Sequence, residues 1–130
     1  MTYELSQRFF FEAAHSLERK IEAEASRRVH GHTYWAELTV DGCPDPSTGM
    51  VMDLGRLRAM IEVVRDQLDH RMLNDVEGLG APTLENLCTF LWHHFELQGC
   101  APSKVTVRRE AMGDSCTLKA RGPSSSSHSR

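Results

Sequence analysis

Two segments of the chain alternate apolar and polar residues with a period of two, the pattern of a β-strand that buries one face. In residues 3–15 the odd positions are mostly apolar, and the even positions carry polar side chains such as Glu4 and Arg8. In residues 30–40 the even positions form the apolar face. The charged segment between them, residues 16–28, is consistent with a long loop or a short helical excursion.

The middle of the chain changes to the three- and four-residue spacing of amphipathic helices. The first helix is expected in residues 52–70, with Asp53 as its N-cap. Its predicted buried stripe consists of Leu54, Leu57, Ile61, Val64 and Leu68. The second helix is expected to begin after Pro82, with Thr83 as its N-cap. Its predicted stripe consists of Leu84, Leu87, Cys88, Leu91 and Phe95.

Two short strands are predicted to follow, at residues 103–110 and 115–120, joined by a turn at residues 111–114. The order is then strand, strand, helix, helix, strand, strand. Strands at both ends with paired helices between them predict an α+β fold, with the helices packed on one face of an antiparallel sheet.

Composition places these elements in one domain. The chain has 130 residues, of which 40% are hydrophobic. We expect the domain to occupy residues 1–121, followed by a disordered Ser-rich tail at residues 122–130. A net charge of -3 without a basic stripe argues against a nucleic-acid partner. No apolar run approaches the ~20 residues of a membrane span, and no signal peptide is recognisable. With four scattered cysteines, which we expect to be reduced, these features predict a cytoplasmic protein.

Three histidines form the first candidate site. His30 and His32 are two residues apart on a predicted strand, so both rings project from one face, and Gly31 permits another segment to approach closely. His15 ends the other strand, and an antiparallel hairpin would bring it beside them. Each histidine alone could equally be structural. Three at one corner of a sheet favour a metal, and a catalytic zinc commonly has three protein ligands and one open position.

Asp69 and His70 form a second candidate site, at the expected end of the first helix. A carboxylate beside an imidazole can orient it and raise its basicity, as in a general base that works near neutral pH. The two would touch only if the helix ends there, and a cation favoured by the helix dipole is an equally good interpretation. Glu110, at the end of the third predicted strand, could bind an amidine-like pair of N–H groups or be a solvated charge.

Six motifs resemble one enzyme family in their order and spacing. They are FFFEAAH, HGHTYW, TGMVMDLGRLR, LDHRMLND, PTLENL and VRRE. Over about residues 3–119 the chain resembles the 6-pyruvoyl-tetrahydropterin synthase and 6-carboxytetrahydropterin synthase family. The resemblance implies the T-fold (tunnelling fold), in which a four-stranded antiparallel sheet carries two helices on one face. Three subunits close a barrel, and two such trimers stack into a homo-hexamer.

The same resemblance implies a zinc site and a substrate. His15, His30 and His32 match the family's zinc ligands. The expected substrate is 7,8-dihydroneopterin triphosphate, whose side-chain hydroxyls bind the zinc. As a Lewis acid, zinc makes the neighbouring C–H and O–H protons easier to remove, and triphosphate leaves. In the bacterial branch the side chain is also cut, which gives acetaldehyde and 6-carboxytetrahydropterin for queuosine synthesis.

Five further residues match functional positions of the family. Asp69 and His70 match its catalytic pair, and Glu110 matches the residue that binds the pterin ring. Thr83 and Glu85 match positions near the pterin pocket.

Ser26 departs from the family pattern. The synthases have a cysteine four residues before the first histidine of HGH, where this chain has Ser26. A thiol can ionise near neutral pH, whereas an unassisted serine hydroxyl is far too weak an acid. Another branch has a glutamate beside that position and makes 6-hydroxymethyl-dihydropterin. Here Arg27 occupies it, although Glu22 and Glu24 are near in sequence.

Three functions therefore stay open. The first is a zinc-dependent lyase of the 6-carboxytetrahydropterin synthase type, in which His70, with Ser26 or a nearby glutamate, transfers protons. The second is 6-pyruvoyl-tetrahydropterin synthase activity, or an aldolase-like cleavage to 6-hydroxymethyl-dihydropterin. The third is a pterin-binding protein that has kept the pocket and lost the reaction.

Overall fold

The computed structural model describes residues 1–17 and 28–121. The predicted tail at residues 122–130 and most of the segment between the first two strands lie outside the described residues. The strands in the described part are β1 (Tyr3–His15), β2 (His30–Gly42), β3 (Arg71–Met72), β4 (Lys104–Arg109) and β5 (Asp114–Lys119). The α-helices there are α2 (Leu54–Arg65) and α3 (Leu84–Leu97), with 3₁₀ turns η1 (Leu73–Asp75) and η2 (Glu110–Met112).

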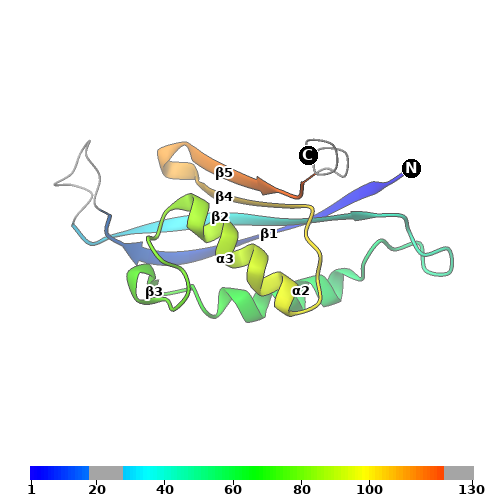
Figure 1. Cartoon of the computed structure of the whole chain (residues 1–130), viewed down its shortest axis with the longest axis horizontal. Helices are drawn as coiled ribbons and strands as arrows, with labels where there is room; N and C mark the ends of the chain where they lie inside the picture. Colours follow the sequence, from blue (N-terminus) through cyan, green and yellow to red (C-terminus); the bar gives the residue numbers. More distant parts are fainter. Residues whose placement is uncertain (18–27, 122–130) are drawn as a thin grey trace, which may run out of the picture.

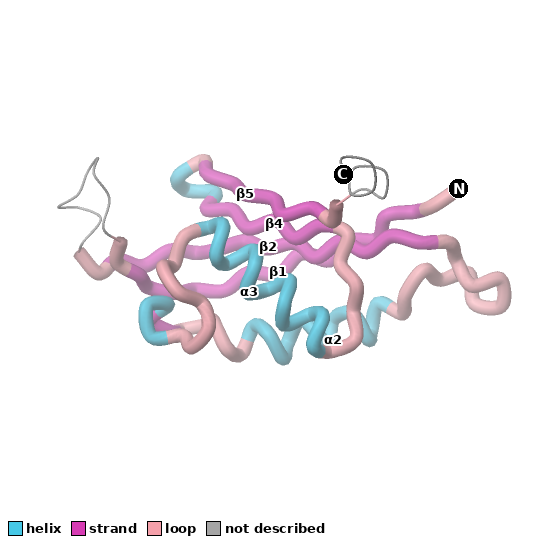
Figure 2. Tube along the Cα trace, in the orientation of Figure 1, coloured by secondary structure: helices cyan, strands magenta, loops and turns pink. Residues whose placement is uncertain are grey.

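The strands form a single twisted sheet with the order β3-β1-β2-β4-β5 (Figure 2). The four long strands are antiparallel, and β1 pairs with β2 along its whole length, from Tyr3 opposite Gly42 to His15 opposite His30. Both helices cover the same face of this sheet (Figure 1). The predicted α+β fold, with two helices on one face of an antiparallel sheet, is therefore confirmed.

The core lies between the helices and the sheet. The odd positions of β1 and the even positions of β2 face inward, and the rings of Phe11 and Tyr34 stack there with centroids 5.1 Å apart. Of the two predicted helix stripes all residues but Leu54 and Leu84 are buried. Leu54, the first residue of α2, is 38% exposed.

Both predicted N-caps are confirmed. The Asp53 carboxylate accepts a hydrogen bond from the Gly55 N–H at 2.7 Å, and the Thr83 hydroxyl accepts one from the Asn86 N–H at 3.1 Å. Each bond satisfies one of the backbone donors that a helix leaves free at its start. None of the described helices is long and apolar enough to cross a membrane.

Three details differ from the sequence prediction. Helix α2 ends at Arg65 rather than near residue 70, and the chain continues as turns. After these turns β3 adds a two-residue parallel strand to the edge of β1, too short to leave a periodic pattern in the sequence. Glu110 begins η2 instead of ending a strand, and Gly113 closes the turn with a positive φ of 76°.

Candidate active site

The three predicted metal ligands converge at one end of the β1–β2 hairpin. His15 lies directly opposite His30 in the strand register, and His32 is on the same face two residues further along. The Nε2 atom of His15 is 3.0 Å from Nε2 of His30 and 3.2 Å from Nε2 of His32. Two nitrogens bound about 2.0–2.1 Å from a tetrahedral zinc are about 3.3 Å apart, so these separations suit one ion.

Backbone carbonyls fix the protonation of two of these rings. Nδ1 of His15 lies 3.2 Å from the carbonyl oxygen of Pro82, and Nδ1 of His30 lies 2.7 Å from that of Arg28. A carbonyl oxygen can only accept, so in the neutral form of each ring Nδ1 carries the proton and Nε2 presents a lone pair. Two lone pairs 3.0 Å apart repel unless a cation lies between them. The three histidines therefore fit a zinc ion, and the backbone carbonyls that accept from Nδ1 orient two of the ligand rings.

Burial keeps the rings in the form that binds a metal. It lowers the pKa of His15 to about 4, although the bond to Pro82 opposes the shift. Burial also lowers the pKa of His32, helped by the positive charge of Arg109. Both rings are therefore neutral at neutral pH, and neutral imidazole is the form that ligates metals. Tyr34, whose hydroxyl is 3.1 Å from Nδ1 of His15, is kept neutral because burial raises its pKa to about 12.

Asp69 and His70 also meet, because α2 ends before them. His70 has a φ of 59°, and its Nδ1 lies 2.9 Å from Oδ2 of Asp69. The turn is held against β1 at Glu12, whose N–H donates to Oδ1 of Asp69 at 2.9 Å and whose carbonyl accepts from the His70 N–H at 2.6 Å. The bond from Glu12 is the main cause that lowers the pKa of Asp69. The arrangement is that of an ionised carboxylate orienting an imidazole.

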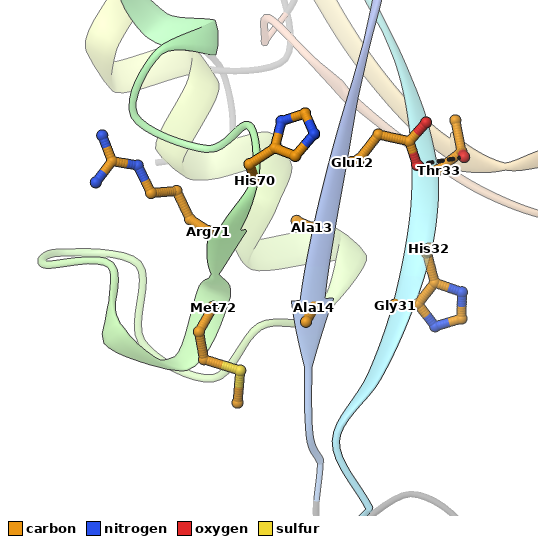
Figure 3. A pocket seen from close by; sticks show the side chains of 9 residues that line it. All are labelled: Glu12, Ala13, Ala14, Gly31, His32, Thr33, His70, Arg71 and Met72. Carbon is orange, nitrogen blue, oxygen red and sulfur yellow. Dashed lines mark hydrogen bonds between the residues drawn. The ribbon is translucent and has the colours of Figure 1, made fainter.

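Within one chain this pair lies apart from the three histidines. The His70 side chain is 79% exposed at the edge of the sheet, and among the described residues no hydrogen bond joins it to the histidines. His70 and His32 do line one open cavity of about 490 Å³, together with Glu12, Gly31 and Thr33. Figure 3 shows His70 beside β1 and the ring of His32 beyond β2, and the Glu12–Thr33 hydrogen bond, which joins the two strands, lies above His32 in this view.

The residues expected around the pterin are divided between two places. Thr83 and Glu85 line a smaller cavity of about 200 Å³ that also includes His15 and Tyr34, so they are close to the histidines. Glu110 lies elsewhere: its side chain is 58% exposed, and Oε1 is 3.6 Å from a guanidinium nitrogen of Arg8.

Arg109 and Asp114 line the same smaller cavity and were not predicted from the sequence. Strand alternation contained the signal, because Arg109 follows Val105 and Val107 at steps of two and therefore shares their inward face. Ser26 was predicted at the family's cysteine position; it lies outside the described residues, as do Arg27, Glu22 and Glu24.

Known proteins are similar to this chain in both sequence and fold. The family model for 6-pyruvoyl tetrahydropterin synthase matches residues 4–120. The chain is 35% identical over 118 residues to the 6-carboxy-5,6,7,8-tetrahydropterin synthase of Synechocystis sp., covering 87% of each chain. It is 33% identical over 99 residues to the dihydroneopterin monophosphate aldolase of Pyrococcus furiosus, covering 76% of this chain and 78% of the relative.

One solved structure shows the same fold. The Caenorhabditis elegans 6-pyruvoyl tetrahydropterin synthase superimposes with a TM-score of 0.77 over 93% of this chain and 97% of its own. The sequence identity in that comparison is 24%, so the likeness concerns the T-fold alone.

Proposed function

The chain belongs to the 6-pyruvoyl tetrahydropterin synthase family, and on that basis we propose that it is a zinc-dependent lyase acting on 7,8-dihydroneopterin triphosphate. The proposed product is 6-carboxytetrahydropterin, as for the synthase from Synechocystis sp.. The observation that carries the proposal is the convergence of three Nε2 atoms, while Nδ1 of His15 and Nδ1 of His30 each face a backbone carbonyl oxygen.

In the proposed mechanism His15, His30 and His32 hold the zinc. When bound, the ion supplies a Lewis acid that polarises the hydroxyls of the substrate side chain. His70 then takes up a proton through Nε2, while Asp69 keeps the proton on Nδ1 and stabilises the imidazolium that forms. The exposed position of His70 leaves Nε2 accessible to a ligand.

Thr83 and Glu85 are proposed to contact the pterin, because the cavity that they line also includes His15. The pterin-binding role of Glu110 stays a prediction, as do the role of Ser26 and the cytoplasmic location. We also propose a homo-hexamer built from two trimeric barrels, which light scattering coupled to size exclusion would test.

The test is incubation of fully zinc-loaded protein with 7,8-dihydroneopterin triphosphate, followed by identification of the products by chromatography and mass spectrometry. Acetaldehyde together with 6-carboxytetrahydropterin supports the proposal. No turnover by protein with stoichiometric zinc contradicts it. Tight pterin binding without turnover would instead identify a pterin-binding protein that has lost the reaction.

A second candidate is an aldolase that forms 6-hydroxymethyl-dihydropterin. It is favoured by Ser26, which replaces the cysteine expected of the synthases, and by the identity with the aldolase from Pyrococcus furiosus. The same assay separates the two by product, since the aldolase would release 6-hydroxymethyl-dihydropterin and a two-carbon fragment that is not acetaldehyde.

A further inference from the structure

Arg109 is a partly buried cation beside the candidate zinc site. Its side chain is 15% exposed, and one terminal nitrogen lies 3.5 Å from Nε2 of His32. The other terminal nitrogen donates to the carboxylate of Asp114. The Nε–H is buried and has no partner among the described residues.

Zinc binding would leave more of these donors without an acceptor. A guanidinium has five N–H groups. Among the described residues, the one acceptor with a hydrogen bond to the first terminal nitrogen is Nε2 of His32, the atom that a metal would use. Once that lone pair binds a metal, N–H groups of the partly buried Arg109 face the site without an acceptor, which is unfavourable unless a ligand accepts from them. An oxygen of the substrate would supply such an acceptor.

The charges around the cavity favour an anionic acceptor. A bound zinc and Arg109 would contribute positive charge, which the paired carboxylate of Asp114 offsets only in part. Counting Glu85, which also lines the cavity, the site is still positive when zinc is bound. An anionic oxygen beside the metal would relieve this excess.

We propose that Arg109 binds the phosphate group of the substrate next to the zinc. This rests on the proposed function, in which the substrate is a phosphorylated dihydropterin. In that compound the phosphate is on the carbon adjacent to a side-chain hydroxyl, so a hydroxyl at the metal brings phosphate oxygens within reach of Arg109. The planar fork of guanidinium N–H groups suits phosphate oxygens better than an amine does.

A purely structural role for Arg109 makes a different prediction. Through Asp114 the side chain ties the start of β5 to β4. If that were its only role, removing the Arg109 side chain would loosen the cavity and weaken the binding of every pterin to a similar degree. Dependence on the phosphate group therefore separates the two roles.

The experiment measures the affinity of zinc-loaded protein for oxidised neopterin triphosphate and for neopterin by calorimetry. In Arg109→Gln we expect the dissociation constant for the triphosphate to rise about 10- to 100-fold, the range for hydrogen bonds to charged groups. The value for neopterin should change less than about twofold. Arg108→Gln is the matched control, because strand alternation directs that side chain to the opposite face, and neither affinity should change.

Zinc content and thermal unfolding establish that each variant is folded. If Arg109→Gln does not fold, Arg109→Lys keeps the charge and should still lose affinity for the triphosphate alone, by a smaller factor. Equal losses for both ligands, or no loss for either, would overturn the assignment. Oxidised pterins report binding and not turnover, so the two proposals can fail separately. If the wild type turns over the substrate but Arg109→Gln binds both ligands as the wild type does, only this inference is contradicted. If Arg109→Gln loses affinity for the triphosphate alone but the wild type shows no turnover, only the proposed reaction is contradicted.

Discussion

Asp69 uses its two carboxylate oxygens for different partners. Oδ1 accepts from the Glu12 N–H, which fixes the turn to β1, and Oδ2 contacts Nδ1 of His70 and lies 3.4 Å from a guanidinium nitrogen of Arg65. The lowered pKa of Asp69 keeps it ionised throughout the neutral range. Its charge is therefore available whenever His70 takes up or releases a proton.

Asp69→Asn should lower kcat by about 10²- to 10⁴-fold, the usual contribution of a positioned acid–base group. The amide can still accept from Glu12, but it no longer holds the proton on Nδ1 of His70. Zinc content should stay at the wild-type value, because Asp69 has no contact with the three histidines. Steady-state kinetics and metal analysis check this, with Asp66→Asn, an exposed carboxylate in the preceding turn, as the control. An unchanged kcat in the Asp69 variant would exclude the general-base role.

At the scale of single residues the sequence predicted the histidines better than their surroundings. Spacing alone placed His30 and His32 on one face, and hairpin geometry brought His15 to them. Arg109 was missed because an arginine at the end of a strand is usually solvated, although alternation with Val105 and Val107 places it on the inward face, where it contacts His32. Glu110 is separated from the histidines because it follows the inward-facing Arg109 and therefore lies on the opposite face, where its carboxylate is near Arg8.

The start of helix α3 connects an element of the fold to the metal ligands. The Thr83 hydroxyl caps the helix, and the carbonyl of the residue before it, Pro82, accepts from Nδ1 of His15. The Thr83 N–H also donates to the carbonyl of Ala81 at 2.8 Å, so a hydrogen bond joins the two residues that flank Pro82. The cap thus stabilises the position of the acceptor that orients His15.

Thr83→Ala should therefore have two effects. Loss of the cap should lower the free energy of unfolding by about 1 kcal/mol. The zinc dissociation constant should rise about tenfold, the lower end of the range for residues that orient metal ligands. Urea unfolding and competition with a zinc chelator measure the two quantities. Thr83→Ser is the matched control, since it keeps the hydroxyl. If Thr83→Ser loses as much stability and zinc affinity as Thr83→Ala, the methyl group, and not the cap, is responsible.

At the scale of elements the predictable parts were those with a long periodic signal or a specific cap. Helix starts at Asp53 and Thr83 followed from capping chemistry. The end of α2 did not follow, because the buried Leu68 continues the helical spacing beyond Arg65 although it belongs to a turn. That turn is where His70 adopts its positive φ, so the part of the fold that was hardest to predict also positions the candidate base.

In the molecule as a whole the three histidines join segments that are far apart in the chain. His15 comes from β1, His30 and His32 come from β2, and His15 is tied through Pro82 to the start of α3. A metal at this point would cross-link both central strands and, indirectly, the helix that packs on β4 and β5. Without a cation, the facing lone pairs of His15 and His30 oppose the same arrangement. Zinc should therefore stabilise the entire domain and not only the site.

Removal of zinc should accordingly lower the melting temperature. Zinc at about 100 times its dissociation constant stabilises a protein by about 2.7 kcal/mol, and in a domain of this size each kcal/mol corresponds to about 4 °C. Chelation followed by scanning calorimetry should thus lower Tm by about 10 °C, and added zinc should restore it. His32→Ala should bind no zinc and show no response, whereas His93→Ala, which removes an exposed histidine of α3, should respond like the wild type. A zinc-dependent rise of full size in His32→Ala would mean that the ion binds elsewhere and that the three histidines are not its ligands.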